Sequence, residues 1–367
     1  MSEGRRAPVV SVDDLSIRLQ TGEPVVEGVS FEVFAGEIVG LVGESGSGKT
    51  VSTQTLLGLT PGADITGQAL FDGVDLLTLD TDRMRHVRGD QIAAIFQDPL
   101  TSLHPLYKVG WQIAEMIRAH DHSVTKAQAH QRAVELLTQV GIPQAARRVN
   151  DYPHQFSGGM RQRAMIAMAL SLNPKLIICD EPTTALDATV QAQILDLLLR
   201  LQREFDTALI MITHDLGVIA DIADSVMVMY AGRAAEYADR RTLFYQPHHP
   251  YTKGLLESIP GSVGAAERLR PIPGQPPSLI NVPSGCGFHP RCRYVMDRCI
   301  SETPPLIMVG SEGGGHRSAC WLPPRATGLG DDAEELRQQA VAAHRSGLAQ
   351  AVAEAAMARV ESGGSVA

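Results

Sequence analysis

The residues with the clearest chemical use lie between Gly43 and Thr50, in the sequence Gly-Glu-Ser-Gly-Ser-Gly-Lys-Thr. This spacing is the pattern of a phosphate-binding loop, in which glycines let backbone N–H groups approach phosphate oxygens closely. Lys49 supplies a positive charge for the β- and γ-phosphates, and the Thr50 hydroxyl is a ligand for Mg²⁺. The sequence therefore predicts a nucleotide site made of Gly43, Glu44, Ser45, Gly46, Ser47, Gly48, Lys49 and Thr50.

The segments on either side of the loop have the periodicity that such a site needs. Apolar residues fill 38–42, which predicts a buried strand entering the loop, and 51–59 has a helical pattern after it. Alternating runs at 9–19 and 29–34 predict a small antiparallel sheet ahead of that strand. Short strands are expected again over 67–96.

The middle of the chain is predicted to be mostly helical, over 104–172. The last of these helices is expected to begin at Ser157, whose side chain is a good helix cap. Buried strands are predicted at 176–179 and 208–212, with a helix at 190–205 between them. A strand–helix–strand order implies a parallel sheet with crossover connections.

Two acids end the predicted strand at 176–179. Asp180 is placed to hold Mg²⁺, and Glu181 to act as a general base or to orient water at the γ-phosphate. Solvated acids at a strand end are the plain alternative, and the intact phosphate loop argues against it. His214 follows the apolar strand 209–213, where a polar residue is also common without any catalytic role.

Five motifs follow one another in a fixed order: the phosphate loop, Gln97, Ser157-Gly158-Gly159, Asp180-Glu181 and His214. In this order the chain resembles the nucleotide-binding subunit of ABC transporters, over roughly residues 9–260. The resemblance implies ATP and Mg²⁺ as cofactors and an α/β P-loop ATPase core with an antiparallel β subdomain and a helical subdomain.

The resemblance also implies a role for each motif. Gln97 would sense Mg²⁺ and the membrane partner, with Thr50 and Asp180 as further Mg²⁺ ligands. The D-loop would be Ala185-Leu186-Asp187, with Asp187 near the nucleotide. The catalytic set would be Glu181, His214 (the switch histidine), Lys49 and Gln97.

The signature motif Ser157 to Met160 implies a second ATPase subunit. A helix N-terminus at Ser157 suits an anion, yet the phosphates of the same domain already lie on the phosphate loop. Two subunits facing head-to-tail, with ATP between them, would resolve this. One departure from the family is Leu19, which stands where an adenine-stacking aromatic is expected, so we expect looser or less base-selective nucleotide binding.

Several further stretches resemble the oligopeptide and dipeptide importers, a branch that also contains nickel importers. They lie at 97–105, 230–233, 249–256, 272–277 and 285–292. The resemblance implies a different second ATPase, two transmembrane permeases whose coupling helices meet region 98–170, and an extracytoplasmic solute-binding protein. It predicts ATP-driven import of peptides, with nickel or another small solute as the alternative. The expected domains are 8–260, a C-terminal cysteine-containing domain at 261–325, and an Ala-rich tail at 326–367.

Four of the five cysteines gather near the C-terminus with the spacing C-x5-C-x6-C-x20-C. Zinc sites tend to use closer C-x2–4-C pairs, whereas iron–sulfur clusters are held by thiolates alone. Relatives with this set are associated with a [4Fe–4S] cluster, which is our prediction, and zinc or free thiols are alternatives. The residues are Cys286, Cys292, Cys299 and Cys320. His289 and His316 could substitute as ligands but are expected to be ordinary surface or packing histidines, and Cys179 is expected to be a buried apolar residue.

Composition limits the partners. The formal net charge of −9 argues against a protein that binds nucleic acid by neutralising phosphates. The polar, basic N-terminus lacks a signal-peptide core, and no apolar run approaches the ~18 residues that span a bilayer. We therefore expect a peripheral protein at the cytoplasmic face of the membrane. A soluble ABC ATPase acting on DNA or ribosomes is less favoured, because the chain has one phosphate loop and no heptad run.

Overall fold

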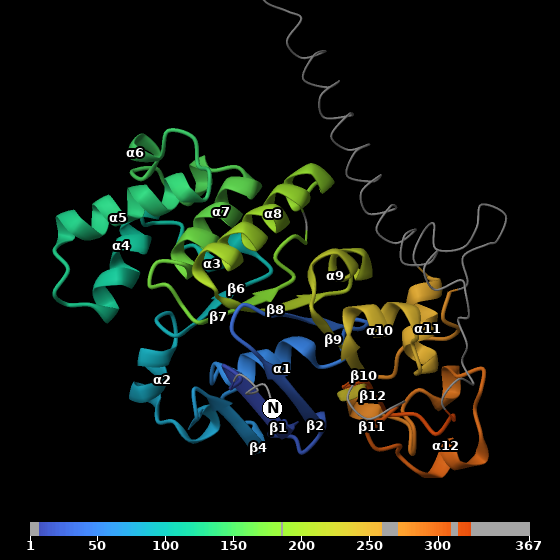
Figure 1. The fold of residues 1–367 in the computed structure, drawn as a ribbon. Coiled ribbons are helices and arrows are strands. Elements are labelled where there is room, and N and C mark those ends of the chain that lie inside the picture. Colours follow the sequence, from blue (N-terminus) through green and yellow to red (C-terminus); the bar gives the residue numbers. More distant parts are fainter. Residues whose placement is uncertain (1–6, 185, 259–270, 310–314, 324–367) are drawn as a thin grey trace, which may run out of the picture. The chain divides into compact units, whose positions relative to one another are not determined.

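The computed structural model describes residues 7–184, 186–258, 271–309 and 315–323. The described residues form two compact units, one from the segments up to Leu79 and from Ile210 onward, the other from Asp80–Leu209. Figure 1 labels most of their helices and strands. The predicted tail at 326–367 lies outside the described residues. No helix within them combines the length and apolar character that crossing a bilayer requires.

The first unit contains the predicted antiparallel sheet, in the order β2-β1-β4-β5. β1 alternates buried and exposed positions, and its buried side chains are the apolar ones. The strand is interrupted at Asp14, where φ is 50°, and the register against β4 shifts there. The bounds are β1 Val10–Arg18, β2 Pro24–Val33, β4 Asp64–Phe71 and β5 Val74–Asp75.

The strand that enters the phosphate loop, β3 (Ile38–Val42), is fully buried and pairs in parallel with β9 (Ser225–Tyr230). From β9 the sheet continues antiparallel through β10 to β12 and β11. The C-terminal segment (described residues 271–309 and 315–323) therefore adds its two strands to the same sheet. Five α-helices of this unit are α1 Lys49–Leu56, α9 Leu216–Ile222, α10 Arg240–Tyr245, α11 Pro250–Glu257 and α12 Asp297–Ser301. Short elements are β10 Arg233–Asp239, β11 Ile307–Met308, β12 Arg317–Ser318, η1 Leu76–Thr78, η3 Leu279–Asn281 and η4 His289–Arg291.

The second unit pairs two parallel strands, β6 (Ile92–Ile95) and β7 (Leu176–Asp180), with a set of helices. The predicted helical middle and its cap at Ser157 are confirmed, and so is the helix after β7. Figure 1 draws α4, α5, α7 and α8 close together in green. The helices are α2 Thr81–Val87, α3 Pro99–Ser102, α4 Val109–His120, α5 Lys126–Gln139, α6 Ala145–Arg148, η2 Pro153–Gln155, α7 Gly158–Ala169 and α8 Ala188–Phe205; β8 Ala208–Thr213 crosses the unit boundary.

The expectation of strands throughout 67–96 is wrong for one segment, because α2 occupies Thr81–Val87. Asp80 caps this helix by accepting a hydrogen bond from the Arg83 N–H at 2.8 Å. An acid in its first turn and basic residues in its last turn also suit the helix dipole. These end effects outweigh the weak alternation on which the strand prediction depended.

Glu236 of β10 is a fully buried acid that ties three parts of the first unit together. Its carboxylate accepts hydrogen bonds from the backbone N–H groups of His248 and His249, at 2.6 and 3.0 Å. His316 lies beside the same carboxylate, with 2.7 Å between Nε2 and Oε1. Both carboxylate oxygens of Glu236 therefore have hydrogen-bond partners.

The variant Glu236→Gln is expected to lower the free energy of unfolding by about 1–3 kcal/mol, because one acceptor oxygen becomes an amide that faces a buried donor. Urea unfolding of the purified chain measures this. The control is Glu302→Gln, which breaks the exposed ion pair with Arg298 (2.8 Å) and should change the midpoint little. Equal midpoints for the two variants would contradict the role assigned to Glu236.

Candidate nucleotide-binding site

The predicted phosphate loop lies between β3 and α1, as the sequence analysis expected. Its glycines are required by the backbone. At Gly43, with φ of 150°, a Cβ atom would lie 2.2 Å from the Met229 carbonyl oxygen. Gly48 caps α1 in a left-handed conformation with φ of 97°. A side chain at either position would displace the loop, and the backbone N–H groups that are predicted to bind phosphate would move with it.

Lys49 folds back over its own loop and is almost completely buried. Its ammonium group donates hydrogen bonds to the carbonyl oxygens of Gly43 and Glu44, at 2.8 and 2.9 Å, and to the Ser47 hydroxyl, at 3.2 Å. The loop is therefore closed around the charge that a triphosphate needs. Thr50, the predicted Mg²⁺ ligand, follows in the first turn of α1.

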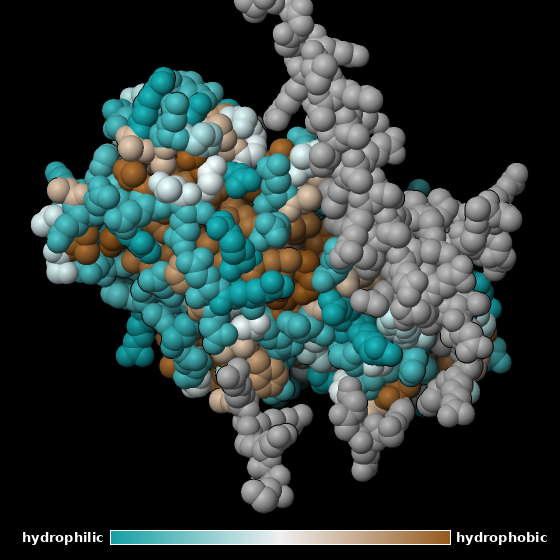
Figure 2. All heavy atoms as spheres, turned by 45° about the horizontal axis from the view of Figure 1, so that its top comes forward, coloured by the Kyte–Doolittle hydropathy of each residue, from teal (hydrophilic) through white to brown (hydrophobic). Residues whose placement is uncertain are grey.

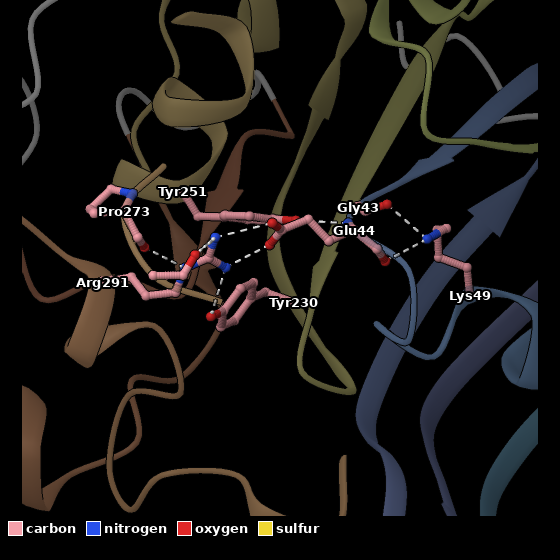
Figure 3. Close-up of polar contacts among 8 residues, drawn as sticks. Gly43, Glu44, Lys49, Tyr230, Tyr251, Pro273 and Arg291 are labelled. Atoms are coloured by element: carbon pink, nitrogen blue, oxygen red, sulfur yellow. Dashed lines mark hydrogen bonds and ion pairs between the residues drawn. The ribbon is translucent and has the colours of Figure 1, made fainter. Parts of the chain in front are cut away.

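Glu44 is anchored through both its backbone and its side chain. Its N–H donates to the Tyr251 hydroxyl at 2.9 Å, and its carbonyl accepts from Lys49. Its carboxylate accepts two hydrogen bonds from the Arg291 guanidinium, at 2.6 and 3.0 Å (Figure 3). Tyr251 and Arg291 were not predicted as site residues, although both lie in the stretches that resemble peptide importers, 249–256 and 285–292.

In the second unit the predicted catalytic acid lies at the end of β7. Asp180 is the last residue of β7, Glu181 follows it, and Gln97 lies two residues after β6; because β6 and β7 are adjacent and parallel, all three lie at the same edge of the sheet. The Glu181 carboxylate accepts hydrogen bonds from Gln97 Nε2 at 3.0 Å and from the Thr184 hydroxyl at 2.9 Å. Two neutral donors therefore fix the orientation of this acid. Thr184 was not among the predicted residues.

The signature stretch begins α7. Ser157 caps this helix by accepting from the Met160 N–H at 3.3 Å, and Gly158 and Gly159 form its first turn. A Cβ atom on Gly159 would lie 2.7 Å from Val190 of α8, so glycine allows the two helices to approach. The signature stretch is thus the N-terminus of α7, and this end of α7 packs closely against α8 at Gly159.

Asp187 and His214 occupy the ends of other elements. Asp187 caps α8 through the Val190 N–H at 3.0 Å, whereas Ala185 of the predicted D-loop lies outside the described residues. His214 is exposed directly after β8. Leu19 follows β1 and is 43% exposed. The first unit thus brings together the phosphate loop residues and contains His214, and the second contains Gln97, Ser157, Gly158, Gly159, Asp180, Glu181 and Asp187.

Cys286, Cys292, Cys299 and Cys320 of the C-terminal segment border one small cavity and form no disulfide among themselves. Burial raises the pKa of Cys286 to about 11 and that of Cys320 to about 12. In the described parts of the chain, no three His, Cys, Asp or Glu side chains are arranged closely enough to hold a metal ion. The thiols therefore share a cavity without meeting at a common point.

The remaining predicted cysteine and histidine assignments can be placed too. Cys179 is completely buried in β7, as expected, and burial raises its pKa to about 12. His289 borders the cysteine cavity, and its Nδ1 lies 3.0 Å from the Cys286 carbonyl oxygen. His316 contacts Glu236 and does not border that cavity.

The fold and the phosphate loop define a nucleotide-binding domain of the ABC type. Residues 26–184 match the ABC transporter family, and residues 235–299 match the oligopeptide/dipeptide transporter C-terminal region. A dimeric ATP-binding cassette, MJ0796, in a post-hydrolysis state with ADP and phosphate has a TM-score of 0.57 at 27% identity, covering 63% of this chain and 98% of that one. For CbiO1 from Clostridium perfringens the TM-score is 0.56 at 25% identity, covering 65% and 90%.

Relatives narrow the class further. The oligopeptide transport ATP-binding protein OppD of Haemophilus influenzae is 47% identical over 319 residues, which is 86% of this chain and 97% of that protein. The dipeptide transport ATP-binding protein DppD of Escherichia coli is 47% identical over 320 residues, with the same coverage. The chain belongs to the family of ATP-binding subunits of oligopeptide and dipeptide ABC transporters. The predicted α/β ABC fold, with its antiparallel sheet and helical part, is confirmed.

The variants Ser157→Ala and Thr125→Ala each remove a helix cap in the second unit, so each is expected to lower the free energy of unfolding by about 1 kcal/mol. Only Ser157→Ala, within the signature stretch, is expected to lower ATP hydrolysis by the assembled transporter as well. Unfolding midpoints and phosphate release measure the two effects. Equal hydrolysis by both variants would show that Ser157 is only a cap.

Proposed function

We propose that this chain binds and hydrolyses ATP to power the import of oligopeptides or dipeptides through a membrane ABC transporter. The observation that carries the proposal is one structural unit that contains both an intact phosphate loop and a C-terminal segment matching the oligopeptide/dipeptide transporter region. The names of the relatives, oligopeptide and dipeptide transport ATP-binding proteins, support peptides as the cargo. Nickel or another small solute is the alternative.

The described residues support a division of chemical roles. The loop N–H groups and Lys49 would bind the phosphates, and Thr50, Gln97 and Asp180 would hold Mg²⁺, whose charge would offset that of the transferred phosphoryl group. Glu181 accepts the proton of the attacking water or orients that water. Because Gln97 donates a hydrogen bond to Glu181, a Gln97 side chain that held Mg²⁺ would also connect the ion to the proposed catalytic acid.

A second ATPase subunit completes the site in this proposal. The N-terminus of α7 presents its first N–H groups beside Ser157, Gly158 and Gly159, and such a helix end favours an anion. The phosphate loop already supplies the binding site for the chain's own nucleotide. We therefore infer that α7 contacts the nucleotide of a partner, head-to-tail, with Asp187 and His214 near the shared nucleotide. The dimeric state of the similar cassette supports this arrangement.

The helical region 98–170 is proposed to receive the coupling helices of two permeases at the cytoplasmic face of the membrane. Hydrophilic residues cover most of the face drawn in Figure 2, with hydrophobic residues gathered in patches between them. Within 98–170 Leu106 is 77% exposed, and exposed Tyr107 and Trp111 stack at 4.3 Å. Exposed stacked aromatics are typical of protein interfaces. A solute-binding protein would deliver the cargo from outside.

In proteoliposomes that hold the chain with its partner subunits, ATP is expected to drive peptide uptake, and Glu181→Gln is expected to slow hydrolysis by about 10²–10⁴-fold through loss of the general base. The matched control is Glu204→Gln, on the exposed face of α8, which should leave both rates unchanged. Uptake of nickel without peptide would support the alternative cargo. Wild-type hydrolysis by Glu181→Gln would contradict the assignment of the base.

We also propose that Cys286, Cys292, Cys299 and Cys320 hold a [4Fe–4S] cluster. Four free thiols around one cavity are the donor set of such a cluster, and burial raises the pKa of several of them, so an iron centre would have to displace their protons. The thiols must also draw closer together than they lie here, because no ready metal site is present among the described residues. Zinc is the alternative occupant.

Anaerobically purified chain is expected to contain about four iron and four acid-labile sulfide per molecule, as a [4Fe–4S] cluster requires. The variant Cys292→Ser should lose this iron. The control Cys179→Ala removes the one described cysteine outside the group and should retain it. Stoichiometric zinc without iron would overturn the cluster and support the alternative metal.

A further inference from the structure

The C-terminal segment reaches the phosphate loop through one side chain. We propose that Arg291, which no motif of the ATPase core contains, is a positioning residue for the phosphate loop and raises the affinity of the chain for nucleotide. Its guanidinium forms a two-fold hydrogen-bonded ion pair with the Glu44 carboxylate, at 2.6 and 3.0 Å (Figure 3). The two residues are 247 positions apart in the sequence.

The guanidinium is held rigidly. Only 5% of the Arg291 side chain is exposed, and 27% of Glu44. Arg291 Nε donates to the Pro273 carbonyl oxygen at 2.9 Å, and Nη1 lies 3.3 Å from the Tyr230 hydroxyl. Because Nε, Nη1 and Nη2 all have partners, the guanidinium group has little conformational freedom. Its two hydrogen bonds to Glu44 therefore hold that carboxylate in place.

Holding Glu44 in place also holds the ammonium group of Lys49, the charge that would bind phosphate. The Glu44 N–H is held by Tyr251, and its carbonyl oxygen accepts from Lys49 Nζ at 2.9 Å. The backbone of Glu44 therefore connects the Arg291 ion pair directly to the lysine that binds phosphate. A loop already in one conformation loses less entropy when a ligand binds, which raises affinity. Arg291 also neutralises an acid that would otherwise repel the phosphates.

The same arginine belongs to the turn that carries the cysteines. Arg291 directly precedes Cys292, and its N–H donates to the Phe288 carbonyl oxygen at 3.0 Å. The Phe288 ring borders the cysteine cavity and lies 5.2 and 5.4 Å from the rings of Tyr230 and Tyr251. A group held in the cavity would therefore contact the turn that presents Arg291 to Glu44. This last step rests on the proposed cluster, whereas the role of Arg291 does not.

The test compares two arginines that flank Cys292. Arg291→Gln is expected to weaken the binding of a fluorescent ATP analogue to the full chain by about tenfold, as loss of one charge-assisted contact implies. Arg293→Gln breaks a 2.6 Å ion pair with Glu257, equally close to the cysteines but not joined to the loop, and should leave the dissociation constant unchanged. Equal affinities for both variants, with both chains folded, would overturn the proposal.

Two further variants separate positioning from a general loss of structure. Arg291→Lys keeps the charge without the fork and is expected to bind with intermediate affinity. Because Arg291 acts through Glu44, the double variant Glu44→Gln/Arg291→Gln should bind no more weakly than Arg291→Gln alone. Fully additive losses would show that Arg291 affects nucleotide by another route and would overturn the proposal. The affinities of Arg291→Lys and of the double variant still decide the proposal if Arg291→Gln also lowers the unfolding midpoint.

A separate experiment tests whether the cysteine cavity affects nucleotide binding through Arg291. Removing iron with a chelator is expected to weaken nucleotide binding by the wild-type chain, and to add nothing to the loss already present in Arg291→Gln. An equal further loss in Arg291→Gln would show that the cysteine segment does not act through this residue. If the chain contains no iron at all, the proposed cluster fails, while the comparison of Arg291→Gln with Arg293→Gln still decides the role of Arg291.

Discussion

The closure of the phosphate loop around the Lys49 ammonium group is the constraint on which the site depends. Three acceptors of the loop itself surround this cation in the structure described here. A conformation that places backbone carbonyls there is compatible only with glycine at Gly43 and Gly48. The position of the Lys49 charge is therefore set by the loop backbone, so the surrounding structure must support the loop to hold that charge in place.

The structure supplies that support from outside the motif. Tyr251 of α11 and Arg291 of η4 engage the N–H and the carboxylate of Glu44, a position that the loop pattern leaves open to any residue type. β12 adds to β10, and the buried Glu236 carboxylate engages His248, His249 and His316. The C-terminal segment is thus built into the unit that carries the loop, by main-chain pairing as well as by side chains.

The parts that sequence predicted well are those with local causes. The strand at 38–42, the cap at Ser157 and the burial of Cys179 each follow from a run of residue types within a few positions. The contact between Glu44 and Arg291 has no such signal, because it depends on how distant segments pack. The helix at Thr81–Val87 was missed for a different reason, since its stability comes from its ends and not from a periodic apolar face.

Glu181 adopts a left-handed backbone conformation, with φ of 45°, that glycine tolerates better than any other residue. Such a conformation costs of order 1 kcal/mol or more in a non-glycine residue, and the fold must supply this from elsewhere. Glycine at this position would relieve the strain and remove the carboxylate at once. With Glu181 in its proposed role as the general base, a substitution that relaxed this turn would gain stability and lose ATP hydrolysis, so stability and activity place opposite demands on this residue.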